Sequence, residues 1–286
     1  MAQKRQVPKE YAMSSILTNN SAMTALQTLK SVNSNLAKTQ DMVSTGKEVG
    51  KAKDNSAIWA ISKVMESDVS GFNAVSESLS LGESTVAVAS AGAEQITNLL
   101  GEIKEKVVAA TGENVDHNKI VADVAELTNQ VNSVISASQF NGANLLNDTG
   151  GDITVLSSLD RSGGTVAPSN ITVASLQFGT NLDLSNIDVS SASAAETSIG
   201  AIETHIQTAV DGAAALGASA KRISDQNEFV GKITDAMESG IGSLVDANME
   251  EASARLQALQ VQQQLATQSL SIANQAPQAI LSLFRG

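Results

Sequence analysis

Few residues of this chain have the types and spacing that chemistry requires. Its two histidines, His117 and His205, lie among polar neighbours on predicted helices, and no second ligand follows at metal-binding spacing. We therefore expect both imidazoles to face solvent. The chain has no cysteine, which excludes disulfides, thiolate metal sites and cysteine nucleophiles.

Two short motifs match catalytic or nucleotide-binding patterns only in part. Residues 44–47 (STGK) fit the S-x-x-K pattern of penicillin-binding enzymes, but so short a constraint is better explained by a loop between helices. Gly240 and Gly242 lack the rest of a dinucleotide fingerprint, and Gly46 lacks the upstream glycine of a P-loop. The sequence therefore predicts neither an enzyme nor a cofactor or metal site.

Charge and composition exclude further classes of protein. The net charge of -12 argues against nucleic acid as a partner, since nucleic-acid binding needs a basic surface. No run of 18 apolar residues is present, so we expect no membrane insertion, and the charged N-terminus leads into no apolar signal region. With three prolines and 2% aromatic residues, the composition suits long helices packed side by side.

Hydrophobic periodicity divides the chain into helices with a β-prone middle. We expect helices over residues 14–43, 56–111, 116–138, 192–237 and 244–284. Residues 147–190, punctuated by glycine pairs, predict two to four short strands. Gly240 and Gly242 are expected to break the chain between the last two helices.

The first and last helices have the clearest pattern, because a mainly apolar seam with a few polar interruptions advances in alternating steps of four and three. The positions are Ala22, Leu26, Leu29, Asn33, Leu36, Gln40 and Val43 in the first helix, and Ala252, Leu256, Leu259, Gln263, Ala266, Leu270, Ala273, Pro277, Ile280 and Phe284 in the last. Between residues 257 and 278 there are eight glutamines and no charge. Such a face suggests a helix that is packed against others or that lines a polar channel, and we expect the two ends to pair with each other and to self-associate.

Four segments resemble the bacterial flagellins. They are residues 14–29 (SSILTNNSAMTALQTL), 44–57 (STGKEVGKAKDNSA), 139–146 (QFNGANLL) and 273–286 (ANQAPQAILSLFRG). Together the resemblance covers about residues 13–150 and 195–286. The family usually begins near Met13, so we expect residues 1–12 to reflect a mis-assigned start at Met1, with a real extension as the alternative.

The resemblance implies a mainly α fold in which the N- and C-terminal segments pair as a long antiparallel helical hairpin or coiled-coil bundle. A small β-hairpin region lies in the middle. In the family's organisation, residues 13–55 with 241–286 would form a helical inner core. Residues 56–146 with 192–240 would form an outer helical core, and residues 147–191 a short β-rich insertion.

The function that the resemblance implies is structural. The subunit would be exported by a flagellar type III apparatus, act with a flagellin chaperone and with hook-associated junction and cap proteins, and polymerise into an extracellular filament for swimming. One alternative is a hook–filament junction protein. Another is a secreted enzyme of the kind that carries an inserted protease, but residues 147–191 contain no histidine for an H-E-x-x-H motif.

Three groups of candidate residues follow. We expect a polymerisation seam at Leu26, Leu29, Leu36, Leu256, Leu259, Leu270, Ile280 and Phe284, and a connecting loop containing Gly46, Lys53 and Asp54, in which Lys53 and Asp54 form an ion pair. Residues 100–108 (LGEIKEKVV) correspond to the stretch by which flagellins engage a Toll-like receptor, and depart from it at Gly101, Glu102 and Lys106. A charge reversal at an interface arginine can repel the partner, so we expect weak receptor activation.

Overall fold

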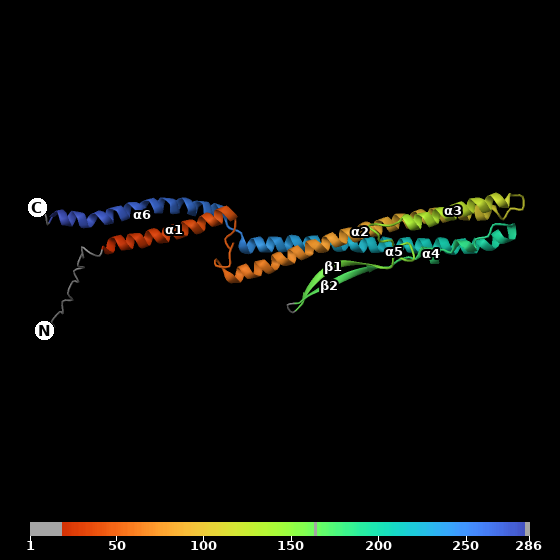
Figure 1. Ribbon diagram of the computed structural model, residues 1–286, viewed down its shortest axis with the longest axis horizontal. Helices are drawn as coiled ribbons and strands as arrows, with labels where there is room; N and C mark the ends of the chain where they lie inside the picture. Colours follow the sequence, from red (N-terminus) through yellow and green to blue (C-terminus); the bar gives the residue numbers. More distant parts are fainter. Residues whose placement is uncertain (1–18, 163–164, 284–286) are drawn as a thin grey trace, which may run out of the picture. The chain divides into compact units, whose positions relative to one another are not determined.

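The computed structural model describes residues 19–162 and 165–283 and is mainly helical with one antiparallel β-hairpin, which confirms the predicted fold class (Figure 1). In chain order the elements are α1 (Asn20–Thr45), α2 (Ser56–Ala109), α3 (His117–Ala137), β1 (Ile153–Ser162), β2 (Thr165–Val173), α4 (Phe178–Asn181), the 3-10 helix η1 (Leu184–Asn186), α5 (Ala192–Val245) and α6 (Met249–Leu283). No helix in these described ranges is long and apolar enough to cross a membrane.

The chain divides into two compact units. The end unit takes the chain up to Val64 together with Gly240 onward, and the middle unit takes Met65–Ser239. Helices α2 and α5 each contribute to both units.

In the end unit, α1 and α6 run antiparallel, side by side (Figure 1). Asn19 Nδ2 donates to Ala273 O at 2.7 Å, and Gln263 Nε2 donates to Asn33 Oδ1 at 2.8 Å. The residue numbers of the hydrogen-bond partners decrease along α6 as they increase along α1, so the two helices are antiparallel. The predicted pairing of the two chain ends is confirmed.

Local signals set the ends of α1. The Asn19 side chain accepts a hydrogen bond from Ala22 N and so caps the first turn. At the other end Gly46 adopts φ 70°, and its N–H donates to Met42 O at 2.9 Å. This left-handed conformation costs glycine little, so the helix ends where the sequence predicted the break.

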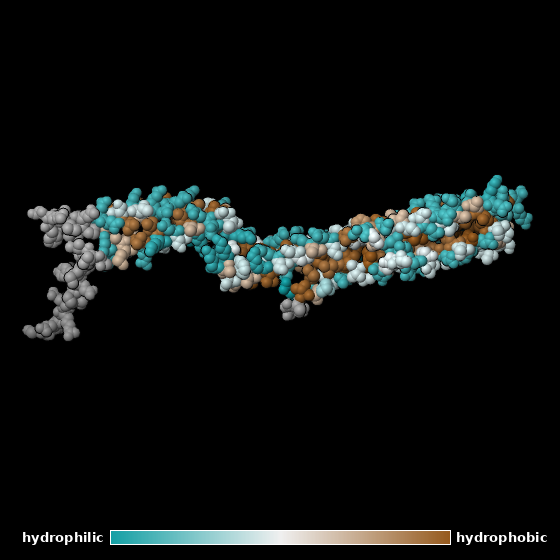
Figure 2. Space-filling model, in the orientation of Figure 1, coloured by the Kyte–Doolittle hydropathy of each residue, from teal (hydrophilic) through white to brown (hydrophobic). Residues whose placement is uncertain are grey.

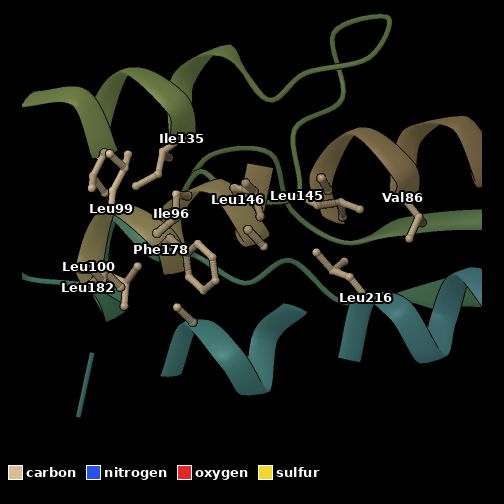
Figure 3. Close-up of a cluster of buried hydrophobic side chains, with 14 of the residues drawn as sticks. Val86, Ile96, Leu99, Leu100, Ile135, Leu145, Leu146, Phe178, Leu182 and Leu216 are labelled. Carbon is tan, nitrogen blue, oxygen red and sulfur yellow. The ribbon is translucent and has the colours of Figure 1, made fainter. Parts of the chain in front are cut away.

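The middle unit has a continuous core. Helix α5 buries a side chain at every seventh residue, namely Ile202, Ala209, Leu216, Ile223 and Val230. Helix α2 does the same in two interleaved series, 79–86–93–100–107 and 75–82–89–96–103, the second of which includes the buried Gly82. This repeat is the signature of coiled-coil packing. Figure 3 shows the part of this core where Phe178 of α4 packs among side chains of α2, α3 and α5.

The β-hairpin packs on α2. Val155, Ile171 and Val173 are buried, and β1 and β2 pair antiparallel with an irregularity between Leu156 and Ser158. The hairpin approaches α2 closely, because a Cβ at Gly82 would lie 2.5 Å from Val155 Cγ2. Near the hairpin tip, the Arg161 guanidinium binds both carboxylate oxygens of Asp68 on α2.

The predicted break at Gly240 and Gly242 is wrong. Helix α5 continues through both glycines to Val245, since a glycine costs a helix only about 1 kcal/mol. The chain turns after Val245 instead. There the Asn248 side chain accepts hydrogen bonds from Glu250 N and Glu251 N and caps α6.

The prediction of solvent-facing histidines is wrong for His205. Its side chain is buried at 7% exposure beneath the segment around η1, and its Nε2 lies 3.3 Å from Asn186 Oδ1. His117 is partly buried, with Nδ1 3.1 Å from Val189 O. The sequence did not show that residues 184–190 fold back over both rings, because this short segment has no repeating pattern.

Candidate self-association site

The packing between α1 and α6 is thin. Its buried centre consists of Val32, Leu36 and Leu259, each 8% exposed, with Leu256 packed against it. A surface cavity of about 310 Å³ opens between the two helices, lined by Ala25, Thr28, Val32, Gln262, Ala266 and Ser269. A pair of helices that buries so little apolar surface is only marginally stable by itself, so the end unit needs further partners.

The register predicted for α1 is wrong at alternate positions. Leu26 is 42% exposed, and Asn33 and Gln40 are exposed, whereas Val32 and Thr39 are buried. The pattern with steps of four and three also fits a second register displaced by one residue at those positions. Leu29 and Leu36 belong to both registers and do face α6, half-buried and buried.

The register predicted for α6 agrees with the structure over its described side chains. Ala252, Leu259 and Ala266 are buried, and Leu256 and Leu270 are half-buried on the same stripe. The side chains of Ile280 and Phe284 lie outside the described part. We call this face of α6 the paired stripe.

A second apolar face on α6 was missed by the sequence reasoning. Val261, Leu265 and Ile272 are 56%, 56% and 69% exposed. At 100° per residue they share one face that lies about 150° around the helix from the paired stripe. We call these three residues the free stripe. Their spacing of four and seven could have identified it, but the surrounding glutamines concealed the pattern.

Other large apolar side chains of the end unit are also uncovered. They are Met23, Leu26, Ile61, Val64, Leu244 and Met249. Figure 2 shows brown apolar surface among the teal side chains of α1 and α6. Scattered exposed apolar residues are ordinary, but three on one face of a stretch without charge are candidates for an interaction surface.

The connecting loop, residues 47–55, is hydrogen-bonded to the turn between α5 and α6. Glu48 N and Val49 N both reach Val245 O, at 2.7 and 3.3 Å, and Ala247 N donates to Gly46 O at 2.8 Å. Val49 is buried. These bonds use peptide groups, so the loop has a defined conformation beside the helical pair.

The predicted ion pair between Lys53 and Asp54 does not form in this described loop. Asp54 Oδ2 accepts from Lys51 N at 3.0 Å, and the Lys51 ammonium binds Asp41 at 2.8 Å instead. The hydrogen bond from Lys51 lowers the pKa of the Asp41 carboxyl.

The candidate receptor-binding stretch lies on α2 in the middle unit. Gly101 is half-buried and Glu102 exposed. Lys106 Nζ binds Asp123 Oδ2 of α3 at 2.6 Å, which raises the pKa of the lysine. The lysine that departs from the expected leucine is therefore held against α3 by an ion pair. Over the described residues, no group of three histidine or acidic side chains could hold a metal.

Comparison with known proteins gives concordant matches over both helical regions. The model of the bacterial flagellin N-terminal helical region matches residues 16–150, and that of the C-terminal helical region matches residues 199–284. Flagellin FljM of Caulobacter vibrioides is 40% identical over 277 residues, and a flagellin of Brucella melitensis is 41% identical over 282 residues. Each alignment covers 96% of this chain and 100% of the relative.

Two more distant matches are also described as flagellins. Flagellin C of Rhizobium meliloti is 35% identical over 324 residues, again covering 96% of this chain and 100% of the relative. A crystal structure of Bacillus cereus flagellin matches 52% of this chain and 86% of that chain, with 19% identity and a TM-score of 0.47. The near-complete sequence matches decide the family.

Proposed function

The chain belongs to the bacterial flagellin family, and we propose that it polymerises into the flagellar filament through the apolar faces of its end unit. The family is one of structural proteins, and the chain spans the whole length of its curated relatives. No feature of the described chain favours the hook–filament junction alternative.

The free stripe of α6 is the observation that supports this mode of assembly. A helix whose two opposite faces are both apolar can pair with α1 on one side and with another copy on the other. Each fully buried side chain of this size contributes roughly 1.5–3 kcal/mol. If the surface on the second copy is a different one, the contact does not close and repeats into a helical polymer.

Further partners follow from the family. We propose export through a flagellar type III apparatus, interaction with a flagellin chaperone and with junction and cap proteins, and an extracellular location in the filament. We also propose that residues 13–55 with 241–286 form the inner core of that filament, residues 56–146 with 192–240 the outer core, and residues 147–191 a small insertion on it. The uncovered surface of the end unit supports the inner position.

The test is seeded growth of filaments from purified protein. The wild type is expected to extend filament seeds, and Leu265→Asp to stop extension, since a carboxylate in a desolvated contact has no partner. Leu265 is exposed in the single chain, so the variant monomer should keep its circular dichroism spectrum. Leu265→Met, which preserves an apolar side chain, is the matched control and should grow normally. Undiminished growth of Leu265→Asp would refute the assembly mode.

We further propose that the departures at Gly101, Glu102 and Lys106 weaken activation of the flagellin-sensing Toll-like receptor. The exposed carboxylate of Glu102 stands where the receptor-binding pattern has an arginine. Reversal of charge removes a charge-assisted bond and adds repulsion. A reporter-cell assay should give a weak response to purified protein, and full potency would reject the proposal.

A further inference from the structure

Charge is distributed very unevenly between the two units. In the described part of the end unit, residues 19–64 and 240–283, seven lysines and arginines face six acidic residues, for a net charge of +1. The middle unit has seven basic and 23 acidic residues, for a net charge of -16. The middle unit therefore carries the whole net negative charge of the described residues.

The basic residues of the end unit gather at one place. A surface cavity of about 300 Å³ beside the connecting loop is lined by Lys38, Lys47, Lys51 and Lys53. Asp41, Glu48 and Asp54 also line it, and Asp41 is paired with Lys51, so the lysines exceed the acidic residues by one. Lys38 and Lys53 are both exposed. We call this group the lysine cluster.

The middle unit has a long stretch without any basic residue. Between Lys63 and Lys104 the chain of α2 contains six acidic residues and no lysine or arginine. They are Glu66, Asp68, Glu77, Glu83, Glu94 and Glu102. Glu83 and Glu94 lie on the same face of α2, because 11 residues make about three turns of helix. We call residues 64–103 the acidic stretch.

We propose that in the assembled polymer the lysine cluster of one copy docks against the acidic stretch of another copy. The proposal rests on the polymerisation proposed above and names a second pair of surfaces for it. Copies packed side by side bring middle units of charge -16 near one another, and this repulsion opposes assembly. Basic groups set between them reduce the repulsion and favour one relative placement of the copies.

The contact is heterologous, since the lysine cluster and the acidic stretch are different surfaces of one chain. Such a contact leaves each added copy with an unused partner surface, as an open helical polymer requires. Exposed charges separated by more than about 8–10 Å are screened at physiological salt. The contact should therefore affect the rate and register of addition most strongly at low ionic strength.

Charge reversal tests the docking. Lys38→Glu/Lys53→Glu should slow the extension of wild-type filament seeds by about tenfold or more at low salt, and less at high salt. Glu83→Lys/Glu94→Lys should slow it in the same way. Lys38, Lys53 and Glu94 are exposed and Glu83 is half-buried, so circular dichroism of each monomer should match that of the wild type.

The combined variant separates docking from a general effect of charge. A copy with all four reversals, growing on seeds of the same variant, should regain most of the wild-type rate. The matched control is Lys30→Glu/Arg222→Glu, which changes the net charge by the same amount at exposed sites away from the lysine cluster. Equal slowing by this control, or failure of the combined variant to recover, would overturn the proposal.

Chemical cross-linking identifies the partners directly, without any substitution. A carbodiimide joins a lysine amine to a nearby carboxylate as an amide. In filaments grown from equal parts of isotopically light and heavy protein, a peptide that joins one light and one heavy partner must bridge two copies. We expect such mixed peptides to link the lysine cluster to acidic residues of 64–103. Cross-links found only within copies, or from the lysine cluster to other surfaces, would contradict the proposal.

The two proposals fail separately. If wild-type protein does not extend seeds, the proposed function fails. If wild-type protein extends seeds and the Lys38/Lys53 reversal grows at the wild-type rate at low salt, only the docking proposal fails.

Discussion

Gly92 determines how closely α2 approaches the turn that follows α3. A Cβ at this position would meet Ser138 Oγ inside van der Waals contact and lie 2.8 Å from Leu146 Cδ1. Ser138 and Leu146 are both buried, so neither can move aside freely. At Gly101, nine residues further along α2, nothing lies within 4 Å of the added atom. The same substitution should therefore act in opposite directions at the two sites.

Gly92→Ala should destabilise the folded chain by about 1–2 kcal/mol, because overpacking outweighs the gain in helix propensity. Gly101→Ala should stabilise it by about 0.5–1 kcal/mol through the loss of glycine's freedom in the unfolded chain. Urea unfolding of the full chain, followed by circular dichroism, measures both. A Gly101→Ala chain that is less stable than the wild type, or a Gly92→Ala chain that is as stable as the wild type, would contradict this account of α2.

At the scale of the helix, the two apolar faces of α6 have different roles. The paired stripe holds α1, while the free stripe is left for another copy. Leu256→Asp and Leu270→Asp place a charge in the α1–α6 contact, so they should lower the helicity of the monomer as well as stop growth. Leu265→Asp should stop filament growth and leave the helicity of the monomer unchanged. This contrast between monomer and polymer distinguishes the roles of the two faces.

Most elements could be predicted from the sequence, because long helices repeat their pattern many times. The paired stripe of α6, the end of α1 at Gly46 and the β-hairpin were all visible in periodicity or turn residues. The register of α1 could not be predicted, because a series through Leu26 and a series through Val32 both advance in steps of four and three. Only packing against the partner helix selects between the two series. The cap by Asn248 was missed, because Gly240 and Gly242 predicted the break between the last two helices.

The residues of the self-association site were harder to predict than the fold. Leu36, Leu256 and Leu259 pack together between α1 and α6, and Leu29 and Leu270 are half-buried. Of the predicted seam residues, Leu26 is exposed and available to another copy, but the free stripe of α6 was not predicted. A single sequence shows which helix faces are apolar, but it does not show which apolar face is already occupied inside the chain. The burial of His205 was missed because it depends on a short segment around η1 that has no repeating pattern in the sequence.

At the scale of the whole molecule, the two units divide the properties that assembly requires. The middle unit has a coiled-coil core and carries the negative charge. The end unit is almost neutral, thinly packed and apolar on its outer faces. A chain built this way has a stable part that folds alone in principle and a part whose stability comes from neighbouring copies.

The central claim is that the free stripe of α6 becomes buried when copies assemble. A helical reconstruction of the filament by electron microscopy, at a resolution that shows side chains, tests it directly. The account predicts that Val261, Leu265 and Ile272 pack against a neighbouring copy with little remaining exposure. A filament in which these three side chains face water, while copies meet through other surfaces, would contradict it.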